Sequence, residues 1–139
     1  MPDSSALAPA LAGIRLTLHV AAATIWVGGQ YVMLGLLATL RSFGGDAAKQ
    51  VARAFGRLSW PAFWVLVATG IWNVMAEHPR QPSGSWNAVL GIKVAVVVLA
   101  GLGAFIHGRA KSKAGLAAWG SIAGLASTAA LILGVFLAG

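Results

Sequence analysis

The chain reads LHVAAATIWVGGQ from Leu18 to Gln30, an apolar stretch that carries a histidine, a tryptophan and a pair of glycines. This stretch lies inside a longer apolar run over residues 11–40, which exceeds the ~20 residues that a helix needs to cross a bilayer. An ionisable side chain at membrane depth costs about 2.5 kcal/mol or more and usually faces a protein interior where it has a partner or a function. His19 is therefore the first candidate functional residue.

The composition is typical of a membrane protein. Of the 139 residues, 58% are hydrophobic and 9% are charged, whereas a soluble domain carries about 25% charged residues. The basic residues behind the net charge of +7 are dispersed among apolar segments and form no patch, so we expect no nucleic-acid partner. Because the chain has no cysteine, disulfides and thiolate metal sites are excluded. We predict an integral membrane protein whose first partner is membrane lipid.

Apolar segments bounded by polar, glycine-rich or proline-rich stretches predict four transmembrane helices, over residues 11–40, 59–76, 86–107 and 116–138. Between the first two, apolar residues recur at helical spacing while lysine and arginine lie on another face. This pattern predicts a short amphipathic helix at the membrane interface before the second span. Pro61 either marks the first turn of that span or kinks a continuous helix. The predicted fold is an all-α, four-transmembrane-helix bundle that forms a single domain over residues 1–139.

The connections between the spans predict the orientation, because Lys and Arg are retained on the cytoplasmic side. The connections after the first and third spans are basic, whereas the one after the second carries one arginine and one glutamate. Both termini are therefore expected outside. On the fourth helix Gly120 and Gly124 form a GxxxG motif that Gly134 continues, and such faces pack helices closely. These glycines serve either packing within the bundle or a homodimer or larger membrane complex.

Polar residues of three helices fall at one predicted depth. His19 and Lys93 lie about eight and seven residues into their helices, so at 1.5 Å per residue both lie roughly 10–12 Å from the outer end. The other members of this predicted outer cluster lie near the outer end of the second helix or at the mouth; they are Asn73, Arg15, Glu77 and His78. The shared depth predicts a site in the outer half of the bundle.

A second, inner pair of candidates is Met33 and His107. Each follows its outer counterpart, His19 or Lys93, by fourteen residues, or about 21 Å. His19 and His107 are therefore too far apart to be the two axial ligands of one haem. Trp26 and Met33 follow His19 at i+7 and i+14 and are expected on its face. Simpler interpretations exist: a hydrogen bond for His19, a snorkelling side chain for Lys93, an interfacial position for His107, and packing for Trp26 and Met33.

Two metal chemistries suit such a cluster. A haem b site needs an axial imidazole, room for a flat macrocycle, and cations or donors for the propionates. Here His19 is the expected ligand and Lys93 or Arg15 the propionate partner; Asn73 and Trp26 complete the expected cofactor-binding residues. Copper prefers thioether or several imidazole ligands. The candidate metal ligands, of which the first two form the best local copper motif at i, i+3, are Met75, His78, His19, His107 and Met33.

The patterns LHVAAATIWVGG, VATGIWNV and WNAVLGIKVAVVVLAGLGAFIHGRA resemble the copper-resistance CopD family of bacterial membrane proteins and the related HemJ-type protoporphyrinogen oxidases. The resemblance extends from about Leu11 to Arg109, and the first helix is closer to the CopD pattern. It implies a multi-pass protein of the bacterial cytoplasmic membrane. In HemJ-like proteins the matching histidine and lysine are functional and haem b is the cofactor, which implies roles for His19 and Lys93. Haem binding, copper binding or uptake, and a noncatalytic membrane subunit are the three expectations; no catalytic residue is assigned.

Overall fold

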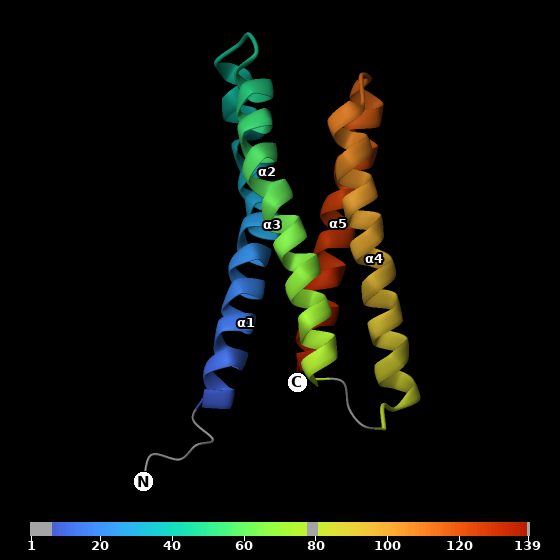
Figure 1. Cartoon of the computed structure of the whole chain (residues 1–139). Coiled ribbons are helices and arrows are strands. Elements are labelled where there is room, and N and C mark those ends of the chain that lie inside the picture. Colours follow the sequence, from blue (N-terminus) through green and yellow to red (C-terminus); the bar gives the residue numbers. More distant parts are fainter. Residues whose placement is uncertain (1–6, 78–80, 139) are drawn as a thin grey trace. The chain divides into compact units, whose positions relative to one another are not determined.

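The structure is a computed structural model that describes residues 7–77 and 81–138 (Figure 1). Within these ranges the chain is helical apart from short connections and contains no strand. Four helical runs are long and apolar enough to cross a membrane: Pro9–Ser42, Ala47–Glu77, Gly84–Arg109 and Lys113–Leu137. The predicted all-α class with four candidate spans is therefore confirmed, and it is consistent with a four-helix bundle in a multi-pass membrane protein. The predicted orientation, with both termini outside, stays a prediction.

The chain divides into two compact units, Met1–Pro79 (unit 1) and Arg80–Gly139 (unit 2). In unit 1, one continuous helical run packs antiparallel to a second helix (Figure 1). The run consists of α1 (Leu7–Ala23), η2 (Thr24–Gly28) and α2 (Gly29–Ser42), and its partner is α3 (Ala47–Glu77). Unit 2 is the antiparallel pair of α4 (Gly84–Arg109) and α5 (Lys113–Ala138). The single domain over residues 1–139 stays a prediction.

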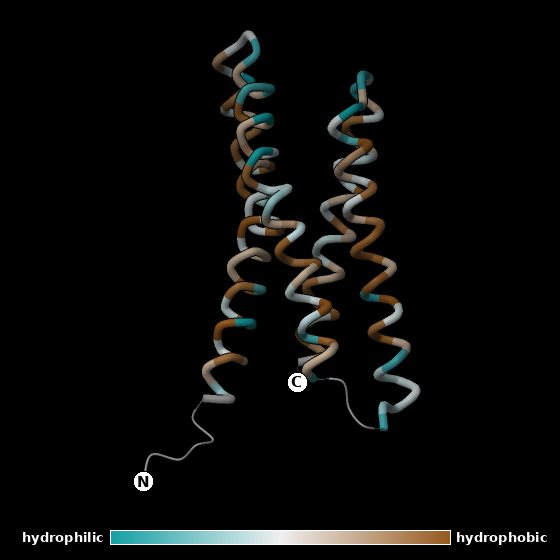
Figure 2. Tube along the Cα trace, in the orientation of Figure 1, coloured by the Kyte–Doolittle hydropathy of each residue, from teal (hydrophilic) through white to brown (hydrophobic). Residues whose placement is uncertain are grey.

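Two glycines form the turn between α2 and α3. Gly44 and Gly45 have φ angles of 72° and 55°, in the left-handed region that glycine enters without a steric penalty. Helix α3 starts after Asp46, whose carbonyl accepts a hydrogen bond from the Gln50 amide at 2.9 Å. In Figure 2 this turn is one of the hydrophilic parts of unit 1, whereas the helices are hydrophobic over much of their length. Polar connections between apolar helices are what a membrane-spanning pair requires.

The amphipathic segment predicted before the second span is not a separate helix. It forms the first part of α3, and the second span forms the rest of the same helix. Helix α3 has 31 residues, and Pro61 lies inside it. The structure thus shows the second of the two interpretations of Pro61, a continuous helix that lacks one backbone hydrogen bond because proline has no amide hydrogen. A helix of this length extends about 46 Å. This exceeds the ~30 Å hydrocarbon core, so the interfacial position predicted for its amphipathic first turns is compatible with the length of α3.

The first helical run contains a π-helical turn, η2, which the sequence pattern did not predict. This turn spans Thr24–Gly28. A π turn holds more residues than an α turn, so the regular spacing that was predicted to align Trp26 with Met33 is interrupted. The Gln30 side-chain amide donates a hydrogen bond to the Trp26 carbonyl at 2.9 Å and satisfies a backbone acceptor within the turn.

Aromatic rings join η2 to α3. The Trp26 ring lies 4.7 Å from the ring of Phe63 and 5.5 Å from that of Trp60, centroid to centroid. The tilted and edge-on arrangements, at 46° and 60°, are those that aromatic quadrupoles favour. Trp26 is only 5% exposed, which makes it the largest buried side chain of unit 1. The packing interpretation of Trp26 therefore has direct structural support.

We expect Trp26→Ala to lower the free energy of unfolding by about 2–3 kcal/mol, because it leaves a cavity against Phe63 and Trp60 that helix backbones cannot close. The loss is less than in a soluble core since lipid also solvates the unfolded apolar surface. Denaturation in mixed detergent micelles, followed by circular dichroism, measures it. Trp72→Ala is the matched control because Trp72 is 41% exposed on α3. Equal losses in the two variants would contradict the packing role.

In unit 2, α4 and α5 approach closely at Gly103. A Cβ atom at this position would lie 3.1 Å from the backbone nitrogen of Ala123 and 3.3 Å from its Cα. Ala100, Ala123 and Ser127 are buried around this contact. Small residues thus allow the two backbones to pack directly, as is common between helices in membranes.

Candidate functional site

His19 contacts α3 through a directed hydrogen bond. Its Nδ1 atom lies 2.8 Å from the Oγ1 atom of Thr69, and this hydroxyl lies 2.6 Å from the carbonyl oxygen of Val65. A threonine hydroxyl has one proton, which Thr69 donates to the carbonyl one turn earlier. The Thr69 oxygen therefore accepts from the Nδ1–H group of His19. In the neutral imidazole this arrangement leaves the lone pair on Nε2.

Such an arrangement is what a ligating histidine requires. An imidazole that binds a metal through one nitrogen almost always donates a hydrogen bond from the other, which fixes the tautomer and the ring orientation. The ring lies beside Gly70 of α3, which has no side chain. A Cβ atom at that position would lie 3.7 Å from the Cε1 atom of His19, in van der Waals contact with the ring. His19 is half-buried in unit 1. The Nδ1 contact thus gives the ring the orientation that ligation through Nε2 would require.

One turn before His19, Arg15 forms an ion pair with Glu77. The Nη2 atom of Arg15 donates to Oε1 of Glu77, the last residue of α3. The Arg15 side chain is 6% exposed and that of Glu77 is 63% exposed. Within residues 7–77 and 81–138, two further buried atoms have no hydrogen-bond partner, the Nε of Arg15 and the Oδ1 of Asn73. These residues lie where α1 begins and α3 ends, which we call the polar end of unit 1. This end holds a buried cation and hydrogen-bonding groups that are incompletely satisfied.

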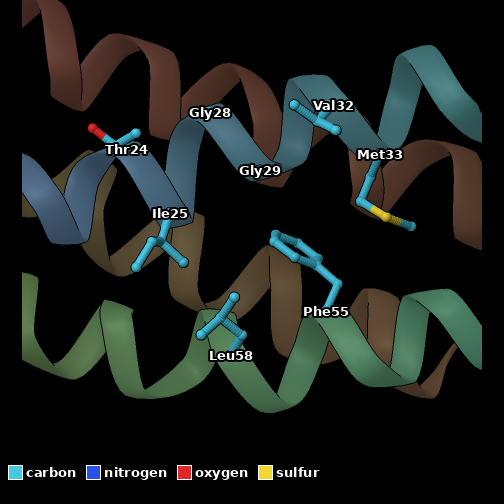
Figure 3. Close-up of a pocket in the computed structure, with 8 residues that line it drawn as sticks. All are labelled: Thr24, Ile25, Gly28, Gly29, Val32, Met33, Phe55 and Leu58. Atoms are coloured by element: carbon cyan, nitrogen blue, oxygen red, sulfur yellow. The ribbon is translucent and has the colours of Figure 1, made fainter.

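Met33 lines a groove at the other end of unit 1. Figure 3 shows this groove, about 370 Å³ in volume, between α3 and the run formed by η2 and α2. The Phe55 ring points at the Gly29 backbone, where a Cβ atom would lie 2.8 Å from the ring Cζ atom. The lining residues are apolar apart from Thr24. Met33 is therefore part of an apolar surface, about 21 Å along the run from His19.

Two further predicted residues with ionisable side chains, Lys93 and His107, lie in unit 2. A Cβ atom at Gly134 of α5 would lie 2.9 Å from the Lys93 ammonium nitrogen, so the absence of a side chain there makes room for the lysine. The Nδ1–H group of His107 donates to the carbonyl of Leu116 at 2.9 Å, and its ring lies against Gly120. His107 thus connects the two ends of the α4–α5 turn.

These contacts show how two of the three predicted interface glycines pack. Gly120 and Gly134 accommodate side chains of α4 in the same unit, and the carbonyl of Gly124 accepts a hydrogen bond from the Thr128 hydroxyl at 2.9 Å. Packing within the chain accounts for Gly120 and Gly134, and a homodimer or larger complex through this face stays a prediction.

The structure brings together part of the predicted outer cluster. Arg15 pairs with Glu77, and His19 follows Arg15 by one turn on α1. Lys93 belongs to unit 2, so its proximity to His19 stays a prediction, as does that of His107 to Met33. His78 lies outside the described residues.

Of the predicted copper pair, Met75 is 78% exposed on α3. In the described part of the chain, no three histidine, aspartate or glutamate side chains gather into a metal-binding group. That finding does not cover methionine ligands, so copper binding by the predicted residues stays a prediction.

Sequence reasoning overlooked Thr69. A single threonine in an apolar helix is common, and its hydroxyl usually bonds to its own backbone. A usable signal was present, however, because Thr69, Asn73 and Glu77 recur every four residues and must share one face of α3. Arg15 and His19 show the same spacing on α1. Two polar faces of this kind in apolar helices predict each other as partners.

Comparison of the chain with protein-family models, with curated proteins and with solved structures found no match.

Proposed function

We propose that the chain is a CopD-like protein of the bacterial cytoplasmic membrane that binds haem b through Nε2 of His19, for electron transfer or tetrapyrrole chemistry. The observation that carries this proposal is the hydrogen bond between His19 Nδ1 and Thr69. It orients the imidazole as axial ligands are oriented and keeps the lone pair on the other nitrogen. When bound, haem supplies a one-electron redox centre whose potential depends on its axial ligand and surroundings.

The other proposed contacts serve the charged edge of the macrocycle. Arg15, one turn from His19, is the proposed partner of one propionate, because a guanidinium pairs with carboxylates through two parallel hydrogen bonds. The amide nitrogen of Asn73 is a further proposed donor to this edge, because an amide NH₂ group donates to a carboxylate. The residues at the polar end of unit 1 thus suit a ligand with an imidazole-binding centre and acidic groups.

The absorption spectrum of the purified protein, before and after addition of haemin, tests the proposal. We expect a Soret band with the position typical of imidazole-ligated haem, saturating at one haemin per chain. A colourless protein that takes up no haemin but binds copper stoichiometrically would overturn it in favour of copper binding. A protein that binds neither and co-purifies with a partner would favour a noncatalytic subunit.

Thr69→Val should weaken haemin binding by roughly 10–100-fold, the usual effect of removing the hydrogen-bond partner of a ligating histidine. Valine keeps the branched shape, and the lost hydroxyl leaves the Val65 carbonyl with its ordinary helical donor. Haemin titration followed at the Soret band measures the change, and Thr128→Val is the matched control because the Thr128 hydroxyl bonds to its own helix in unit 2. Unchanged affinity in Thr69→Val would contradict the role assigned to this hydroxyl.

A further inference from the structure

The ion pair at the polar end of unit 1 is asymmetric. The guanidinium of Arg15 is almost fully buried, whereas the carboxylate of Glu77 is mostly exposed. A buried cation in an apolar helix needs an anion, because an unpaired charge there is costly. The exposed partner has no such need, since water solvates a carboxylate well. The pair therefore matters to Arg15 much more than to Glu77.

The pairing with Glu77 also leaves part of the hydrogen-bonding capacity of Arg15 unfilled. The structure gives one hydrogen bond between the two side chains, from Nη2 to Oε1, and the Nε atom has no partner within the described residues. Guanidinium groups bind carboxylates most strongly through two parallel hydrogen bonds. A carboxylate that approached with both oxygens would therefore serve Arg15 better than Glu77 does.

The position of Glu77 allows its carboxylate to separate from Arg15. Glu77 is the last described residue of α3, and Pro79 follows it by two positions in the sequence. Helices usually end at or before the residue that precedes a proline, so we place Glu77 in a terminal turn, which opens more easily than a helix interior. Its exposed position means that separation from Arg15 moves it only slightly further into water. The cost of separation therefore falls on the buried guanidinium, and an incoming carboxylate removes that cost by pairing with Arg15 again. One carboxylate can thus replace another at Arg15 without change in the charge of the site.

We propose that Arg15 is a binding site for the carboxylate of an amphiphile and that Glu77 occupies this site as an intramolecular competitor, which the ligand displaces. Arg15 lies inside the candidate span Pro9–Ser42, so the ligand must carry its carboxylate on an apolar body. Haem propionates and fatty-acid carboxylates share this chemistry. The haem arm rests on the proposed function, and the fatty-acid arm does not.

The test compares two ligand pairs, haemin with its dimethyl ester and dansyl-undecanoic acid with its methyl ester, by Soret and fluorescence titration of the full chain. Glu77→Gln should tighten binding of both acids about tenfold, the factor expected when Glu77 holds Arg15 about nine-tenths of the time. The affinity for the esters should change less than about twofold, because an ester has no carboxylate to compete with Glu77 for Arg15. Arg15→Gln should remove the preference for acid over ester.

Asp46→Asn is the matched control. It makes the same acid-to-amide change and the same change in net charge, at an exposed ion pair with Lys49 at the other end of unit 1. Equal tightening in Glu77→Gln and Asp46→Asn would overturn the proposal as a general charge effect. Tightening of acids and esters alike would overturn it as removal of a steric block.

The two proposals fail in different ways. If neither haemin nor its ester gives an imidazole-ligated Soret band, the haem function fails, and the fatty-acid pair alone decides on Arg15 and Glu77. If both haemin forms bind but Glu77→Gln changes no acid-to-ester ratio, haem binding stands and the competitor role is overturned. Circular dichroism of each variant identifies any loss of helix. If Arg15→Gln does not fold, the acid and ester affinities of Glu77→Gln alone test the competitor role.

Discussion

His19→Ala should abolish the imidazole-ligated Soret band and weaken haemin binding by more than about 100-fold, the upper range for loss of a supporting contact alone. The substitution removes the ligand without creating an unpaired group on α3, because the Thr69 hydroxyl still donates to the Val65 carbonyl. A loss of binding would therefore reflect the ligand itself and not a disrupted helix pair. Optical titration with haemin measures both the band and the affinity.

Two comparisons make this prediction specific. His107→Ala is the matched control, since it removes the same side chain from the α4–α5 turn of unit 2. It should leave the spectrum unchanged. Free imidazole added to His19→Ala should restore part of the Soret band by occupying the space that the side chain leaves. A band that survives in His19→Ala, or that disappears in His107→Ala instead, would show that the axial ligand was assigned to the wrong helix.

The helices of this chain were predictable from sequence because apolar length decides whether a segment spans a bilayer. The breaks were equally clear, with Gly44 and Gly45 at one turn and a proline-rich connection at the next. The start of the second helix was not predictable from hydrophobicity alone, because α3 begins at Ala47 and continues through Pro61. A helix continues beyond its apolar segment when no residue at the end of that segment terminates it.

The site was predictable only in part. Arg15 and His19 stood out because ionisable side chains are rare in apolar helices, but Thr69, which fixes the His19 tautomer, did not. The π turn η2 also escaped prediction, since no simple residue pattern specifies it. Counting residues along helices gives a depth and not a lateral distance. The predicted meeting of His19 and Lys93 therefore requires information on how the helices associate, which periodicity does not contain.

Gly103→Leu should separate α4 from α5 and lower the free energy of unfolding by about 3 kcal/mol or more, the upper range for overpacking. A Cβ atom at this position already comes within 3.1–3.3 Å of Ala123 backbone atoms and of the Ile122 side chain. Helix backbone cannot yield as a flexible side chain does, so the three further carbons of leucine force the helices apart. Detergent denaturation followed by circular dichroism measures the loss.

Helix separation is costly here because van der Waals contact supplies most of what holds two apolar helices together in lipid. The contact is closest where both helices carry small residues, with Ala100 2% exposed on α4 and Ala123 4% exposed on α5. Gly91→Leu is the matched control, because a Cβ atom at Gly91 on the same helix meets nothing within 4 Å. We expect that variant to be nearly neutral, and Gly103→Ala to cost about 1 kcal/mol. Equal stability of the two leucine variants would show that the Gly103 contact does not hold unit 2 together.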